Sequence, residues 1–218
     1  MDTAIRRAGR QPEEVLLVAV SKGHSVESIA AAYAAGHRDF GENRADEMMT
    51  KVPRLPDDIR WHFVGALQSR KARLVRPRTW LLHSLDRPSL LRAWVRDGLP
   101  VPPALVQVNI AREPQKHGVD PDEVATLVES ARDAGIECRG LMILPPAPTD
   151  PEDSRPWFRE LVALQKRLRP AFPELAELSM GMTDDFEVAI SEGASVIRVG
   201  RAIFGPRNPG YPSGARGI

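Results

Sequence analysis

The sequence predicts a closed (β/α)₈ barrel of the TIM-barrel class, with eight parallel strands in one domain spanning residues 1–218. Eight short apolar runs recur along the chain, helical stretches separate them, and no Gly-x-Gly-x-x-Gly fingerprint follows the first run. Such alternation requires parallel strands joined by right-handed crossovers, and about 27 residues per unit suits a barrel slightly under the usual ~250 residues. A doubly wound open sheet is the alternative, and the missing fingerprint disfavours it.

Four of the expected strands lie in the first half of the chain. They are LLVAV (16–20), HRDFGEN (37–43), RWHFVG (60–65) and WLLHSLD (80–86). The spacing of apolar residues predicts helices at 26–35, 44–51 and 67–75, and a fourth that begins at Pro88. Gly36 suits the C-terminal stop of the first helix, and Asp86 is expected to cap the fourth.

The second half repeats the same order. Its expected strands are PALVQVNI (103–110), CRGLMIL (138–144), LSMGM (178–182) and ASVIRVG (194–200). Asp120 and Pro121 open a helix that is expected to run to Ala134 and to stop at Gly135. A proline-rich loop at 145–156 precedes a helix ending near residue 169, and a further helix is expected at 184–192.

Composition argues against several classes of protein. The formal net charge of +1 gives no electrostatic footprint for nucleic acid or an anionic membrane, so neither is an expected partner. Two basic runs, at 69–78 and 167–170, are expected to be solvated faces of outer helices. The single cysteine, Cys138, excludes an internal disulfide and a multi-cysteine zinc site, and we expect no metal. With no membrane-length apolar segment and a charged first stretch, the chain is expected to be cytoplasmic.

Lys22 stands out because it directly follows an apolar strand. The carboxyl ends of barrel strands share one edge, where active sites collect. Side chains alternate along a strand, so Lys22 shares a face with Val18 and Val20. If that face lies inside the barrel, partial burial lowers the lysine pKa from ~10.4 and favours the neutral amine that forms a Schiff base with an aldehyde. A simply solvated lysine is the alternative.

The last two strands offer a place for a phosphate group. Gly200 follows the final strand without a side chain, so the backbone N–H groups of Gly200 and Arg201 can approach an oxyanion. Ser179 adds a hydroxyl at the end of the seventh strand. Phosphate sites at the loops after strands seven and eight are common in such barrels. The other strand ends supply mostly small or polar groups, namely Asn43, Gly65, His83, Ser84, Asn109, Met142 and Arg198.

Eight sequence motifs within residues 16–205 contain these strand-end residues or lie next to them. They are VAVSK (18–22), FGEN (40–43), WHFVGALQSRK (61–71), HSLD (83–86), QVNIAREPQKHG (107–118), GLM (140–142), LSMGMTDDFEVAI (178–190) and IRVGRAIFG (197–205). In order and in register, they resemble the pyridoxal phosphate homeostasis proteins, whose fold is similar to the N-terminal barrel of alanine racemase (fold type III). Departures from the family pattern are Thr183, Arg70, Gly23 with His24, and the roughly fifteen residues before Leu16, where members usually carry a helix.

The resemblance implies that the chain binds pyridoxal 5′-phosphate as a Schiff base on Lys22. Arg198 would face the pyridine nitrogen, while Ser179 and the backbone of Gly200 and Arg201 would hold the phosphate. The pocket around the ring would be lined by Asn43, His83, Ser84 and Met142.

The resemblance also implies a carrier that takes part in intracellular cofactor homeostasis, with apo forms of pyridoxal phosphate enzymes as recipients, and no catalytic residue. A pyridoxal phosphate-dependent amino-acid racemase is the alternative. Racemisation needs a base on each face of the substrate, and Lys22 supplies one. In alanine racemase the other base is a tyrosine brought with a second domain, for which this chain has no room. Its tyrosines are Tyr33, in an expected outer helix, and Tyr211 in the tail.

Two further expectations concern function and assembly. A sugar-phosphate barrel enzyme, whose lysine forms a Schiff base with its substrate, is a third possible function. The sequence shows no sustained exposed apolar stripe that would require a dimer, so we expect a monomer.

Overall fold

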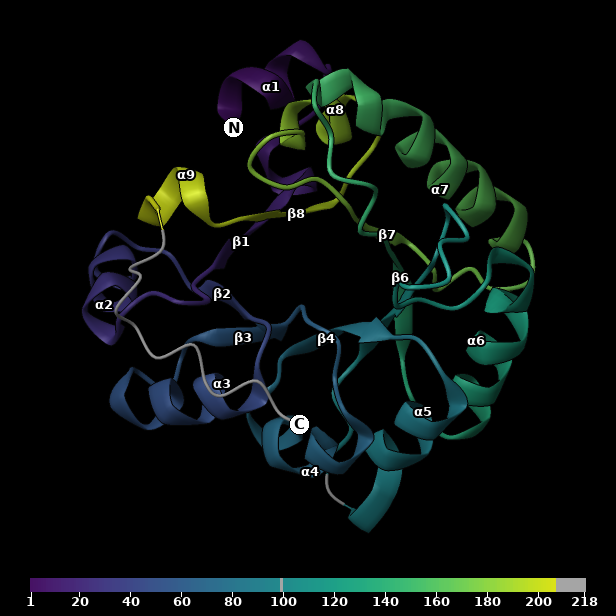
Figure 1. Ribbon diagram of the computed structural model, residues 1–218, viewed down its shortest axis with the longest axis horizontal. Coiled ribbons are helices and arrows are strands. Elements are labelled where there is room, and N and C mark those ends of the chain that lie inside the picture. Colours follow the sequence, from purple (N-terminus) through teal and green to yellow (C-terminus); the bar gives the residue numbers. More distant parts are fainter. Residues whose placement is uncertain (99, 207–218) are drawn as a thin grey trace.

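The computed structural model describes residues 1–98 and 100–206, and these form the predicted barrel. Its strands are parallel and follow one another around the barrel in sequence order, with helices outside them (Figure 1). They are β1 (Leu16–Val20), β2 (Asp39–Glu42), β3 (Arg60–Phe63), β4 (Leu81–Leu85), β5 (Ala104–Gln107), β6 (Cys138–Met142), β7 (Glu177–Ser179) and β8 (Val196–Val199). Pairing of β1 with both β2 and β8 closes the barrel and sets Val18 opposite Arg198.

One helix precedes β1, and helices follow the strands in the expected alternation. They are α1 (Asp2–Arg7), α2 (Val26–Ala34), α3 (Ala45–Lys51), α4 (Ala72–Val75), α5 (Pro88–Val95), α6 (Val124–Asp133), α7 (Arg155–Leu168), α8 (Phe186–Ser191) and α9 (Arg201–Phe204). Short 3-10 turns occupy Pro12–Glu14, Val52–Arg54, Ser69–Lys71, Arg76–Arg78, Arg96–Gly98, Pro121–Glu123 and Pro151–Ser154. No helix within residues 1–98 and 100–206 is both long and apolar enough to cross a membrane.

Two helix predictions were wrong in detail. Asp86 does not cap α5: Arg87 is the N-cap residue, and the Asp86 carboxylate instead pairs with the Arg87 guanidinium. Pro88 begins α5 because its fixed φ suits the first helical position. The helix expected at 67–75 is also shorter, since α4 spans only Ala72–Val75 between two 3-10 turns. Its end at Val75 agrees with the prediction, and the difference lies at its start, where Ser69–Lys71 forms a 3-10 turn instead of α-helix.

The segment before β1 contributes a helix that the sequence reading did not predict. Ala4 and Ile5 of α1 are buried in the main hydrophobic core. The Arg10 guanidinium then donates to the carbonyl oxygen of Ala194, and Leu16 N–H donates to the Ser195 carbonyl at 2.8 Å. This segment therefore covers the amino ends of β1 and β8.

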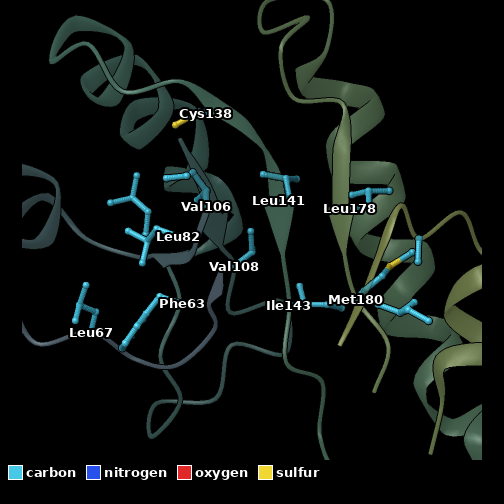
Figure 2. Close-up of a cluster of buried hydrophobic side chains, with 14 of the residues drawn as sticks. Phe63, Leu67, Leu82, Val106, Val108, Cys138, Leu141, Ile143, Leu178 and Met180 are labelled. Atoms are coloured by element: carbon cyan, nitrogen blue, oxygen red, sulfur yellow. The ribbon is translucent and has the colours of Figure 1, made fainter. Parts of the chain in front are cut away.

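The barrel separates an outer core from an inner one. Figure 2 shows part of the outer core, where Phe63, Leu82, Val106 and Leu141 point away from the barrel axis toward the helices. The alternate residues of the same strands point inward. Apolar residues inside the barrel include a small separate cluster of Leu81, Leu105 and Met142. Buried polar side chains also lie in the interior, beneath the site described next.

Candidate functional site

A cleft of about 720 Å³ lies at the carboxyl ends of β1, β2, β3 and β8. Five of the residues that the sequence predicts for cofactor binding line it, namely Lys22, Asn43, Arg198, Gly200 and Arg201. The structure therefore brings together residues that are up to 179 positions apart in the chain, counted from Lys22 to Arg201.

Backbone contacts on both sides of Lys22 fix its position. Ser21 N–H donates to the Gly41 carbonyl at 2.9 Å, which continues the pairing of β1 with β2. Gly23 N–H donates to Glu47 Oε1 at 2.6 Å. The half-buried Lys22 side chain therefore leaves β1 from a backbone that is tied to β2 and to α3.

A buried ionic cluster underlies this segment. Lys51 Nζ donates to the Ser21 carbonyl at 2.8 Å, to Glu42 Oε1 at 2.6 Å and to Glu47 Oε1 at 2.7 Å. Ser21 Oγ donates to the same Glu42 oxygen at 2.8 Å. Burial raises the pKa of Glu42 to about 7 against the opposing effect of Lys51. Sequence reasoning missed this cluster, although the i, i+4 spacing of Glu47 and Lys51 was a usable signal.

Two glycines allow close backbone approaches around the cleft. A Cβ atom on Gly65 would lie 2.3 Å from the Asn43 carbonyl oxygen, so only glycine fits there. A Cβ atom on Gly200 would lie 2.9 Å from the Val20 carbonyl oxygen. Gly200 thus brings the start of α9 next to the end of β1. The first N–H groups of α9 have no acceptor within the helix, which leaves them available to an anion in the cleft.

Arg198 projects inward from β8 and forms the buried base of the cleft. Its Nη1 donates to Ser179 Oγ at 2.6 Å and its Nη2 donates to the Ile143 carbonyl at 2.8 Å. Burial lowers the pKa of Arg198 to about 10, against a smaller opposing effect of Asp185. The guanidinium therefore stays a cation at neutral pH.

The other four predicted site residues are fully buried and are not among the residues that line the cleft. Ser179 lies between Arg198 and His83, whose Nδ1 is 2.9 Å from Ser179 Oγ. Met142 packs with the inner apolar cluster, and Ser84 Oγ has no hydrogen-bond partner. Their roles as cofactor contacts stay predictions.

The cleft also contains residues that the sequence reading did not assign. The His24 ring packs 5.1 Å from the Phe204 ring, and the Arg201 guanidinium pairs with Asp184. Leu144 and Met182 add apolar surface to the wall. Within residues 1–98 and 100–206, no group of three or more His, Cys, Asp or Glu side chains could hold a metal ion.

This arrangement suits an anionic carbonyl compound. A primary amine can capture a carbonyl carbon, a buried cation can donate to a basic atom opposite it, and the N–H groups that begin α9 can hold an oxyanion.

Comparison with known proteins gives a consistent set of relatives. Residues 1–208 match the family described as alanine racemase, N-terminal domain. The pyridoxal phosphate homeostasis protein of Aquifex aeolicus is 39% identical over 212 residues, which is 94% of this chain and 92% of the relative. The protein of the same name from Vibrio alginolyticus is 40% identical over 213 residues, with coverage of 93% and 91%.

Solved structures agree with these relatives. PipY of Synechococcus elongatus without PLP superimposes with a TM-score of 0.82 at 36% identity, covering 93% of this chain and 99% of PipY. PipY with PLP bound gives a TM-score of 0.79 at 35% identity with the same coverage. Alanine racemase from Corynebacterium glutamicum gives a TM-score of 0.71 at 19% identity, covering 97% of this chain and 61% of that one. This last likeness concerns the fold alone.

Proposed function

The chain belongs to the family of pyridoxal phosphate homeostasis proteins, and we propose that it holds pyridoxal 5′-phosphate on Lys22 and buffers it without catalytic turnover. The observation that carries the proposal is the convergence of Lys22, Arg198 and the start of α9 on one cleft. Two relatives are named pyridoxal phosphate homeostasis proteins, and the solved structure of the similar protein PipY has PLP bound, which supports the proposal.

The residues present fit this cofactor. When bound, pyridoxal phosphate supplies an aldehyde that a primary amine captures reversibly. Lys22 provides that amine, and the backbone of Gly200 and Arg201 would hold the phosphate. The buried Arg198 would face the ring nitrogen, and Asn43 would line the space beside the ring.

The charge of Arg198 bears on how reactive a bound cofactor would be. A guanidinium is a donor only and cannot take a proton from its partner. Since Arg198 remains charged at neutral pH, it favours an unprotonated ring nitrogen, which makes the ring a weaker electron sink. Alanine racemase shares this type of contact, so Arg198 alone does not decide between carrier and enzyme.

In alanine racemase a tyrosine supplies the second base, and the described residues place no tyrosine in the cleft. Tyr33 lies on α2, where its hydroxyl donates to Asp58 at 2.6 Å, and no tyrosine within residues 1–98 and 100–206 lines the cleft. Tyr211 lies outside the described residues. His24 lies in the cleft but packs against Phe204. These observations support a carrier.

The visible spectrum of the purified protein tests the proposal. The wild type is expected to be yellow, and borohydride should fix a pyridoxyl group on Lys22. Lys22→Ala should lose both properties, because it removes the amine that bonds to the aldehyde. Lys116→Ala is the matched control, since Lys116 pairs with Glu113 outside the cleft, and it should keep both.

Two results would contradict the proposal. A colourless wild type that also refuses added pyridoxal phosphate would favour the sugar-phosphate enzyme. Racemisation of L- or D-alanine that copurifies with the wild type and disappears in Lys22→Ala would establish an enzyme.

The proposal extends to how the carrier works in the cell. We propose a cytoplasmic monomer, one barrel domain over residues 1–218, that releases the cofactor to apo forms of pyridoxal phosphate enzymes. Mixing the loaded protein with such an apo-enzyme should restore its activity faster than spontaneous release allows, and gel filtration should give the monomer mass.

A further inference from the structure

A column of buried polar side chains crosses the inside of the barrel beneath Arg198. Its members come from five strands: Arg198 from β8, Ser179 from β7, His83 from β4, His62 from β3 and Asp39 from β2. Each is at least nine-tenths buried. We call this set the interior relay. Only its Arg198 end reaches the cleft.

Consecutive members of the interior relay are within hydrogen-bond distance. Arg198 Nη1 is 2.6 Å from Ser179 Oγ, and His83 Nδ1 is 2.9 Å from the same oxygen. His83 Nε2 is 3.0 Å from His62 Nδ1. His62 Nε2 is 3.1 Å from Asp39 Oδ1. The relay is therefore continuous from the cleft to β2.

The two ends of the relay determine the direction of every bond. An ionised Asp39 can only accept, so His62 Nε2 donates to it. Burial lowers the pKa of both histidines, which favours the neutral form. In a neutral His62 the Nδ1 atom accepts, so His83 Nε2 donates to it and His83 Nδ1 accepts the Ser179 proton. Arg198 can only donate, so Ser179 Oγ accepts from it, and both histidines are assigned as the neutral Nε2–H tautomer.

The far end of the relay is anchored near solvent. Burial opposes ionisation of Asp39, but hydrogen bonds from His62 and Arg60 outweigh it and lower its pKa to about 2. Arg60 Nε donates to Asp39 Oδ1 at 2.8 Å, and its side chain is 45% exposed at the start of β3. The relay thus runs from a buried cation to a paired anion.

We propose that His83, supported by His62 and Asp39, is a positioning residue that fixes the direction in which Arg198 faces the cleft. This rests on the proposed function, because the ring nitrogen is the partner that Arg198 would meet. By accepting the Ser179 proton, His83 turns the Ser179 lone pairs toward Arg198 Nη1. With Nη2 held by the Ile143 carbonyl, the guanidinium plane is then fixed at two points.

Histidine ¹⁵N NMR of the cofactor-free protein tests the relay itself. His62 and His83 are expected as neutral Nε2–H tautomers, each with its pKa below that of an ordinary histidine because of burial. In Asp39→Asn the fixed acceptor is lost, so His62 should show a mixture of tautomers. A wild-type His83 protonated on Nδ1 would overturn the relay whether or not the protein binds pyridoxal phosphate.

Cofactor binding by His83 variants tests the positioning role. His83→Leu removes the acceptor for Ser179, and we expect about tenfold faster release of pyridoxal phosphate and a shifted pH midpoint of its visible band. His83→Asn can place an amide oxygen near the former Nδ1 and should restore most of both properties. Thr79→Val is the structural control, because it removes a buried hydrogen bond to the Val75 carbonyl away from the cleft.

The outcomes separate the two proposals. A His83→Leu protein that binds and titrates like the wild type overturns the positioning role and leaves the proposed function standing. If neither wild type nor Thr79→Val binds the cofactor, the proposed function fails and the positioning role fails with it. If His83→Leu does not fold, Asp39→Asn replaces it, and an unchanged release rate and pH midpoint in that variant would overturn the role.

Discussion

At the scale of single residues, this protein places ionisable groups where water cannot reach them. Glu42 and Lys51 are both fully buried beneath the Lys22 segment. One Glu42 oxygen accepts from Lys51 and Ser21, whereas the other has no hydrogen-bond partner. A buried carboxylate with one unpartnered oxygen is costly, which explains why burial dominates its pKa.

This cost predicts a pH dependence of stability. The pKa of Glu42 is about 7 in the folded protein against an ordinary 4.5, so the folded state binds a proton that the unfolded state releases between these values. The resulting stabilisation is present below about pH 4.5 and is lost as pH rises through about 7. Glu42→Gln should remove it, so that from pH 5 to pH 8 the wild type loses on the order of 1–3 kcal/mol relative to the variant.

Urea unfolding of both proteins at several pH values measures this difference. Glu129→Gln is the control, because Glu129 is exposed on α6 and should leave the wild-type pH profile unchanged. Parallel profiles of the wild type and Glu42→Gln would show that Lys51 keeps Glu42 ionised throughout.

At the scale of elements, α1 contributes more to the hydrophobic core than its mostly charged sequence indicates. DTAIRR holds two apolar residues that both face the core, Ala4 and Ile5, and α1 lies beside α8 at the top of Figure 1. The sequence reading expected nothing helical before β1. A six-residue helix with two buried positions is too short to show a recognisable helical periodicity in the sequence. Its packing against α8 stabilises it in the folded protein.

Ile5→Ala tests the contribution of α1. Since Ile5 is fully buried, the substitution is expected to lower the free energy of unfolding by about 2–5 kcal/mol. Leu74→Ala on α4 is the matched control, because Leu74 is 42% exposed and should change much less. Chemical denaturation of the three proteins makes the comparison. Equal losses in both variants would mean that α1 is not docked in solution.

At the scale of the whole molecule, one edge of the barrel holds the cleft and the opposite edge anchors the interior relay. The relay replaces part of the apolar filling that other barrels carry in layers of branched side chains. Leu81, Leu105 and Met142 form a small apolar cluster in the barrel interior. The outer core between strands and helices is far larger and holds the fold together.

Cofactor loading is therefore expected to stabilise the whole barrel. At a hundredfold excess over its dissociation constant, a ligand of the folded state adds about 2.7 kcal/mol. For a chain of this size the thermal midpoint should rise by about 5 to 10 °C. Thermal unfolding with and without pyridoxal phosphate measures the shift, and Lys22→Ala should lose most of it. An equal shift in Lys22→Ala would place the stabilising contact elsewhere.

The sequence by itself determined the eight-unit alternation, the strand centres, and the placement of Lys22, Asn43 and Arg198 at one end of the barrel. These follow from local periodicity and from the rule that parallel strands share their carboxyl ends. Family resemblance added the cofactor.

Only the tertiary structure decided which polar side chains meet. The interior relay joins residues 39, 62, 83, 179 and 198, and the ionic cluster joins Glu42 to Lys51 beneath Ser21. The hydrogen-bond contact between His83 and Ser179, below the cleft, likewise joins side chains that are 96 positions apart in the chain. Strand register and the closure of β1 on β8 set these distances, and neither can be read from the spacing of residues along the chain.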